Sequence, residues 1–376
     1  MLFPLTAAVL FTLATLLPAA LVGLVLWLLR CRTRTFWRRV AWAHAGLFVL
    51  HLFVGFPVAL GWFGSRMVGT RHDERGYDGP RLDASGALLR QDRASLRRER
   101  EAGRPEVAAE IAAAARARAV HVTSADGTEL RLFRLEALRE PPAAVAVLVH
   151  GLFRSALELE APAALYRELG CECWLVELRN HGGSGRAPFT GGLRESDDVV
   201  AAVQHVRSVP GRAQTPVVLS GVSLGTVAVA LALPRLDGIA AVVLDSPIDD
   251  LHAAAHRMLA FDRDGDRRRF FHLHEPWRST VLAALGAWSG FVVADVVPSD
   301  VLATLPHDLS VLVVGAEHDD RAPPATVEAL FARLPMPAER RELWLVPGAA
   351  HGDACSHDPA GYRARLERLL ARRRGS

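Results

Sequence analysis

The stretch from Thr215 to Val227, TPVVLSGVSLGTV, joins a short apolar run to a tight glycine-rich turn and then to an alanine- and valine-rich segment. This order predicts a strand, a sharp turn and a helix, which is the arrangement that a G-x-S-x-G nucleophile elbow requires. Because such a turn is strained and brings backbone segments close together, a side chain at Gly221 or Gly225 would collide with its neighbours. Ser223 is therefore expected at the tip of the turn, directly before a helix N-terminus.

Composition limits the classes of function. The chain has 376 residues, enough for one large domain with an appendage or for two modest domains. Its formal net charge is +3, and all 44 of its Lys+Arg residues are arginine. Because these arginines are scattered or lie beside apolar segments, no nucleic-acid partner is expected. The four cysteines have no zinc-like spacing, and Cys171 and Cys173 are expected to be small buried side chains.

The N-terminal part is strongly apolar. Met1 to Leu29 and Val40 to Ser65 contain no charged residue, and five arginines lie between them. Each stretch is long enough to cross the hydrocarbon core, so residues 1–65 are predicted to form a two-helix transmembrane anchor. A signal peptide is the rival interpretation, but the basic start and the short apolar stretch typical of one are missing. The positive-inside rule puts the arginine loop in the cytoplasm and the rest of the chain on the extracytoplasmic side. His44 and His51 are expected to contact the partner helix or an interface.

Residues 66–118 have a different character, being rich in arginine, glutamate and alanine. Leu89 to Glu101 and Pro105 to Arg118 are expected to be helices of a juxtamembrane connector. Their charges are interpreted as a solvated face, with contact to lipid headgroups as the alternative.

From Val120 the apolar pattern changes to a period of two, and His121 to Leu135 reads as a β-hairpin that turns at Asp126-Gly127. Apolar strand candidates separated by longer helical stretches follow, which predicts a mostly parallel sheet covered by helices on both faces. In such sheets, ligands bind where loops leave the carboxyl ends of the strands. The strand candidates are 144–149, 173–178, 216–219, 240–244, 311–314 and 343–346.

Loops after these strands hold the groups that acyl transfer needs. The strand candidate 144–149 is followed by His150-Gly151-Leu152-Phe153, where the backbone N–H of Leu152 can point into a site. With the N–H of Leu224, which follows the serine at the helix start, it would bind the oxyanion of a tetrahedral intermediate. His150 is interpreted as a structural histidine that holds this loop.

A serine hydroxyl becomes a nucleophile when a histidine takes its proton, and a carboxylate orients that histidine. Residues 315–324, GAEHDDRAPP, and 347–352, PGAAHG, follow the last two strands. They supply His351 and two candidate acids, Asp319 and Asp320, in the chain order Ser, Asp, His. Asp245, at the end of an earlier strand, is a further candidate acid.

Residues 119–376 resemble the α/β-hydrolase superfamily. The resemblance is carried by five motifs in order: HG at 150–151, ELRNHGGS at 177–184, GVSLG at 221–225, the acid loop and the histidine loop. In the second motif, Glu177 stands where the family pattern has aspartate. The resemblance implies an α/β-hydrolase fold and a Ser223, Asp319 and His351 triad. Asp319 matches the family's spacing to a proline and resembles the first aspartate of the D-D-R loop in prolyl-oligopeptidase-like members.

Residues 246–309 form an insertion before the acid strand that is long for a simple connection. It is expected to be a small helical cap over Ser223, with Phe270, Phe271, Trp277 and Trp288 as either pocket walls or cap core. Asp262 to Asp266 resembles the start of a calcium loop, but the glycine and the bidentate glutamate of such loops are missing.

The sequence therefore predicts a membrane-anchored serine hydrolase that cleaves carboxylic esters, lipid or acyl esters first among them, through an acyl-enzyme. No metal or organic cofactor is implied, and the oligomeric state stays open. The alternatives are an amidase or peptidase, a thioesterase, and a catalytically silent membrane-bound binding scaffold of the same fold.

Overall fold

The structure is a computed structural model that describes residues 20–21, 23–25, 27, 34–69, 119–260, 273 and 275–373. The chain divides into two compact units. The helical unit comprises Met1–Met67 and Ala255–Val293, and the sheet unit comprises Val68–Ala254 and Ala294–Ser376. The predicted Met1 to Leu29 helix lies almost wholly outside the described residues, as do the connector helices within residues 70–118.

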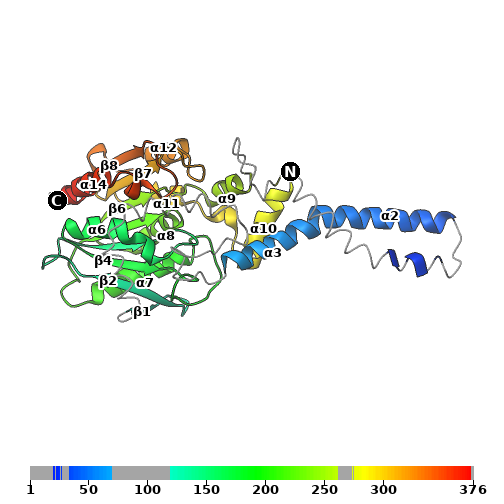
Figure 1. Ribbon diagram of the computed structural model, residues 1–376, viewed down its shortest axis with the longest axis horizontal. Coiled ribbons are helices and arrows are strands. Elements are labelled where there is room, and N and C mark those ends of the chain that lie inside the picture. The colour runs from blue at the N-terminus through cyan, green and yellow to red at the C-terminus, as the bar shows by residue number, and fades with distance from the viewer. Residues whose placement is uncertain are drawn as a thin grey trace. The chain divides into compact units, whose positions relative to one another are not determined.

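The sheet unit is built on one eight-stranded sheet, with strand order β1-β2-β4-β3-β5-β6-β7-β8 (Figure 1). β1 and β2 form the expected hairpin, and β2 also pairs antiparallel with β4, whereas all the other pairings are parallel. The predicted mostly parallel sheet is thus confirmed. The strands are β1 Val120–Thr123, β2 Glu129–Leu135, β3 Ala144–Val149, β4 Cys171–Glu177, β5 Val217–Val222, β6 Ile239–Asp245, β7 Ser310–Ala316 and β8 Arg341–Val346.

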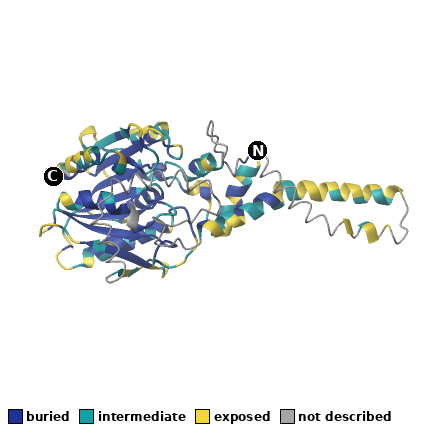
Figure 2. Cartoon of the chain, viewed as in Figure 1, coloured by how far each residue is buried: buried dark blue, intermediate teal, exposed yellow. Residues whose placement is uncertain are grey.

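Helices cover both faces of this sheet because successive strand side chains point to opposite sides. In β3, Val145, Val147 and Val149 belong to one buried apolar cluster, and the residues between them belong to the other. Figure 2 shows the central strands buried. The first cluster includes residues of α7 Glu195–Ser208, α8 Leu224–Ala232 and α12 Pro324–Ala332; the second includes residues of α6 Glu160–Glu168, α13 Ala354–His357 and α14 Pro359–Arg373.

The strand β4 tests the expectation for the cysteines. It begins at Cys171, earlier than the predicted 173, and both Cys171 and Cys173 are fully buried with free thiols in the same apolar cluster. The prediction of small buried side chains is confirmed, and alternation within the strand explains why the two share a face.

The helix predicted for Val40 to Ser65 is longer than expected. α2 Arg34–Leu50, the π-helical turn η1 His51–Gly55 and α3 Phe56–Val68 follow one another without a break. The prediction of a loop up to Arg39 is wrong in part, since arginine is a good helix former and Arg34, Arg38 and Arg39 lie within α2. The segment Arg34–Val68 is long and apolar enough to cross a membrane, and few of its residues are buried. Among the described residues, α10 with the segment after it passes the same test only if the pair counts as one broken span.

The two histidines of this helix bond locally. The Nδ1 of His44 lies 2.7 Å from the Val40 carbonyl oxygen, and the Nδ1 of His51 lies 2.8 Å from that of Leu47. Each ring therefore bonds one turn back along its own helix, a contact that the sequence analysis did not anticipate.

The insertion forms α9 Leu251–Ala260, α10 Trp277–Ser289, η5 Val293–Asp295 and α11 Pro298–Leu302. Its middle part belongs to the helical unit, because α10 packs on α3. A Cβ atom at Gly61 would lie 2.6 Å from the Ala284 Cβ, so only a glycine allows this approach. The predicted calcium-like segment and Phe270 and Phe271 lie outside the described residues.

A tryptophan of α10 also bonds to the π-helical turn. The indole N–H of Trp277 donates to the Leu52 carbonyl oxygen at 2.8 Å, and its ring stacks on Phe53 with centroids 5.8 Å apart. In a π-helical pattern this carbonyl would accept from residue 57, but Pro57 has no N–H. Trp277 therefore supplies the missing donor.

Candidate active site

The turn between β5 and α8 has the geometry predicted for an elbow. Ser223 has φ 54° and ψ −119°, a strained conformation for a residue with a side chain. A Cβ at Gly221 would lie 2.5 Å from the Gly225 carbonyl oxygen, and one at Gly225 would lie 2.4 Å from the Val149 carbonyl oxygen. Both glycines are therefore required for the close backbone approach that the sequence analysis expected.

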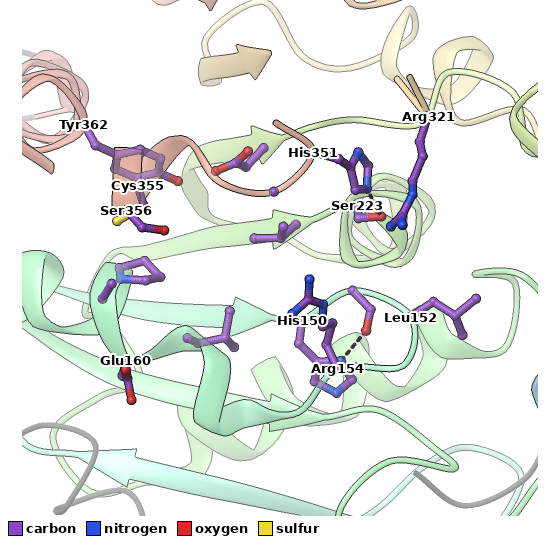
Figure 3. Close-up of a pocket in the computed structure, with 17 residues that line it drawn as sticks. His150, Leu152, Arg154, Glu160, Ser223, Arg321, His351, Cys355, Ser356 and Tyr362 are labelled. Atoms are coloured by element: carbon purple, nitrogen blue, oxygen red, sulfur yellow. Dashed lines mark hydrogen bonds between the residues drawn. The ribbon is translucent and has the colours of Figure 1, made fainter. Parts of the chain in front are cut away.

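Ser223, His351 and Asp319 are connected by hydrogen bonds. The Nε2 of His351 lies 2.7 Å from the Ser223 Oγ, and its Nδ1 lies 2.8 Å from Asp319 Oδ2 and 2.9 Å from Oδ1. Figure 3 shows the His351 ring directed at Ser223. The three side chains follow β5, β7 and β8, so the parallel sheet brings them to one edge. In this arrangement the imidazole can take the hydroxyl proton while the carboxylate fixes its tautomer.

The two adjacent aspartates are in different environments. Asp319 is 3% exposed and accepts the backbone N–H groups of Arg321 at 2.9 Å and Ala322 at 2.8 Å, whereas Asp320 is exposed. Burial by itself would raise the pKa of Asp319, but the charge and hydrogen bond of His351 and the two N–H groups together hold it below its ordinary value. The geometry thus favours Asp319 over Asp320 as the partner of His351.

Asp245 lies near the same edge at the end of β6. Its carbonyl oxygen accepts the N–H of Ser223 at 2.9 Å, so it supports the elbow through the backbone. Burial, together with the nearby Asp319 and Asp353 carboxyls, raises the pKa of its side chain to about 7, although hydrogen bonds to Tyr362 and Ser246 oppose this shift. Asp245 is a less suitable partner for an imidazolium than the ionised Asp319.

The predicted oxyanion donors lie on both sides of the serine. A Cβ at Gly151 would lie 3.2 Å from the Ser223 Cβ, so the loop before Leu152 packs directly on the elbow. Leu224 is the first residue of α8, where backbone N–H groups have no acceptor within the helix and the dipole favours negative charge.

Two buried histidines hold the loop that contains Leu152. The Nε2 of His150 accepts the Leu178 N–H at 3.2 Å, so its Nδ1 carries the proton and donates to the Gly151 carbonyl oxygen at 2.7 Å. The Nε2 of His181 accepts the Phe153 N–H at 3.2 Å, and the two rings lie 4.7 Å apart. This bonding agrees with the structural role expected for His150. The part played by His181 was missed, although it lies in one of the recognised motifs.

The loop from 177 to 185 is fixed by buried ion pairs. The Glu177 carboxylate accepts from Arg131 Nε at 2.6 Å and from the Gly183 N–H at 2.8 Å. Arg179 donates to Asp198 at 2.6 Å, and both side chains are fully buried. These contacts account for a tight loop beside the site, as predicted.

A pocket opens at Ser223. Its charged lining residues Arg154, Glu160 and Arg321 were not predicted from the sequence, although Arg321 stands in the quoted acid loop (Figure 3). Trp277, one of the candidate walls, packs on the N-terminal helix, and Trp288 is exposed. The lining residues are His150, Gly151, Leu152, Arg154, Leu159, Glu160, Ala161, Pro162, Val222, Ser223, Asp245, Arg321, His351, Gly352, Cys355, Ser356 and Tyr362.

The sheet order, the elbow after β5 and the loops after β7 and β8 define the class of α/β hydrolases. A sequence profile of the alpha/beta hydrolase family matches residues 146–365, and the chain belongs to this family. A search of curated proteins found no match.

Solved structures support the same fold. An esterase from Pyrococcus furiosus superposes with a TM-score of 0.54 at 19% identity, covering 68% of this chain and 90% of that one. Est1E from Butyrivibrio proteoclasticus, with ferulic acid bound, superposes with a TM-score of 0.51 at 17% identity, covering 68% of this chain and 100% of its own. At these identities the likeness establishes the fold alone.

Proposed function

We propose that the chain is a serine hydrolase of carboxylic esters that is anchored to a membrane by its N-terminal segment. The observation that carries the proposal is the pair of contacts made by His351, 2.7 Å to the Ser223 Oγ and 2.8 Å to Asp319. The positive φ of Ser223 supports it as well, because strain of this kind is concentrated at functional sites.

In the proposed reaction, the Ser223 hydroxyl attacks the ester carbonyl while His351 takes its proton. The N–H groups of Leu152 and Leu224 bind the resulting oxyanion, and Asp319 stabilises the imidazolium. His351 then gives its proton to the leaving alcohol. Water, activated by the same histidine, releases the acid from the acyl-enzyme. In these steps the chain contributes side chains and backbone groups, and water is the second reactant.

A fluorophosphonate probe tests the nucleophile. We expect the purified full-length chain to be labelled, and Ser223→Ala to abolish labelling. Ser208→Ala is the matched control, because Ser208 is exposed at the end of α7 and bonds only to its own helix among the contacts described. Equal labelling of wild type and Ser223→Ala would rule out this serine.

The bond type is tested with matched octanoyl esters, thioesters and amides. We expect the ester to give the highest kcat/KM. A preference for the thioester or the amide would place the chain with the corresponding alternative activity, and labelling without turnover of any of them would argue against the proposed substrate class.

The proposed anchor comprises residues 1–65, and lipid or acyl esters that partition near the bilayer are the proposed substrates. The apolar helix Arg34–Val68 supports the anchor, and the arginines at its N-terminal end favour a cytoplasmic position for that end. The hydrolase domain would then be extracytoplasmic. A reporter that is active only outside the cytoplasm should be active when it is fused after Ser376. If a reporter that is active only in the cytoplasm works at this position instead, the proposed orientation is reversed.

A further inference from the structure

The pocket at Ser223 holds two arginines, on opposite sides of the serine. Arg154 belongs to the loop that supplies Leu152, and its Cγ would lie 3.7 Å from a Cβ at Gly151. Arg321 belongs to the acid loop, where its N–H bonds to Asp319 Oδ1 at 2.9 Å. Figure 3 shows both side chains extending into the region of Ser223. Two cations thus flank the position of the scissile bond.

The charged side chains that line the pocket are the two arginines and two carboxylic acids, Glu160 and Asp245. Glu160 is the one glutamate of the lining, and Asp319, which bonds to the Nδ1 of His351, is not among the lining residues. Burial raises the pKa of Asp245 to about 7, so this carboxyl is only partly ionised near neutral pH, and arginine charge exceeds carboxylate charge among the lining residues. Each guanidinium has five N–H donors, more than a single carboxylate partner accepts.

Part of the lining is apolar. Leu159 comes from the short helix η3 Ala156–Leu159, Ala161 and Pro162 come from α6, and Val222 comes from the end of β5. An acyl chain can pack on these side chains, whereas a guanidinium favours carboxylate or phosphate oxygens, which it binds in a bidentate manner.

We propose that the substrate is an acyl ester that carries an anionic group close to the scissile bond, bound by Arg154 and Arg321. This inference rests on the proposed ester hydrolase function and narrows its substrate class. A phosphate and a carboxylate share the required chemistry, and the test separates them.

The test compares three octanoyl esters on the full-length chain in detergent, with released octanoic acid as the readout. The esters are 1-octanoylglycerol 3-phosphate, octanoyl glycolate and the neutral 1-octanoylglycerol. We expect kcat/KM for at least one anionic ester to exceed that for the neutral ester by tenfold or more. A gain for the phosphate ester alone identifies phosphate as the recognised group, and a gain for both identifies anionic oxygens in general.

Substitutions then assign the effect to the arginines. Arg321→Met and Arg154→Met should each raise KM for the preferred anionic ester by about tenfold or more and change that for the neutral ester by less than threefold. Arg321→Lys should retain part of the preference, and Arg333→Met, which removes an exposed arginine paired with Asp300, should change neither. Fluorophosphonate labelling of each variant checks that the fold and the nucleophile are intact.

The two failures are distinguishable. If no ester is hydrolysed and Ser223 is not labelled, the hydrolase function itself is wrong. If the neutral ester is hydrolysed as well as the anionic ones, or if labelled Met variants keep the preference, the hydrolase function stands and the role of the arginines is overturned.

Discussion

The Nδ1 of His351 lies 2.8 Å from the carboxylate of Asp319, and the next residue, Asp320, is exposed. If Asp319 orients and stabilises the imidazolium, Asp319→Asn should lower kcat by about 10³ to 10⁴ with little change in KM. Asp320→Asn should retain kcat within about threefold. Steady-state kinetics on an octanoyl ester measure both. The reverse ranking of the two variants would make Asp320 the acid.

Buried and exposed ion pairs of the sheet unit should differ in their contribution to stability. Glu177 is fully buried against Arg131, so Glu177→Gln leaves a buried cation without its counter-charge and should cost about 3 kcal/mol or more. The pair of Asp300 with Arg333 is exposed, and Asp300→Asn should cost less than about 1 kcal/mol. Urea unfolding, followed by circular dichroism, compares the two. Similar losses of stability in the two variants would show that burial of an ion pair does not determine how much it contributes.

Most of the fold was accessible from sequence because buried parallel strands are continuous apolar runs. The run 144–149 matches β3, and the other strands differ from their predicted bounds by a few residues at their ends. The positions of Ser223, Asp319 and His351 could be predicted because each follows a strand and the chain order is specific to one triad fold. Their meeting at one edge follows from parallel strands.

Contacts between distant segments could not be predicted in this way. The bond from Trp277 to Leu52 joins residues 225 positions apart, and nothing in the local pattern of either segment pairs them. The pocket arginines were missed for a related reason. Arginines are frequent throughout this chain, so only the folded loops distinguish Arg154 and Arg321 from exposed ones.

Packing of α10 on α3 should depend on Gly61. A valine there would place its Cβ 2.6 Å from the Ala284 Cβ and 2.8 Å from the Val281 carbonyl oxygen, so the helices must separate. Gly46→Val is the matched control, because a Cβ at Gly46 on the same helix meets nothing within 4 Å. We expect Gly61→Val alone to speed trypsin cleavage within residues 255–293, by about fivefold or more for a loss of 1 to 3 kcal/mol. Equal cleavage of both variants would contradict the importance of this contact.

Asp245 should make stability depend on pH on the neutral side. The pKa of its carboxyl is about 7 in the folded chain, against an ordinary value of 3.8. Between these values the folded state binds a proton at Asp245 that the unfolded state has lost. The contribution of Asp245 to the free energy of unfolding is therefore greatest at acid pH and falls as the pH rises towards 7. The shift in pKa corresponds to a loss on the order of 4 kcal/mol across this window. Asp319, whose pKa is lowered, acts in the opposite sense and only at more acid pH, where its contribution is lost as the pH falls.

Asp245→Asn isolates this contribution, because the amide stays neutral at every pH and can still accept the hydrogen bond from Tyr362. Relative to wild type, the variant should gain stability as the pH is raised from about 4.5 to 8, whereas the two proteins should change in parallel above pH 8. Urea midpoints measured at intervals across this range test the expectation. Asp300→Asn serves as the control, since this exposed carboxyl should add no slope on the neutral side. If the wild-type and Asp245→Asn curves are parallel from pH 4.5 to 8, Asp245 ionises at an ordinary pH in the folded chain. The carboxyl beside the elbow would then be fully charged at neutral pH, and with Glu160 it would balance the charges of Arg154 and Arg321 among the residues that line the pocket.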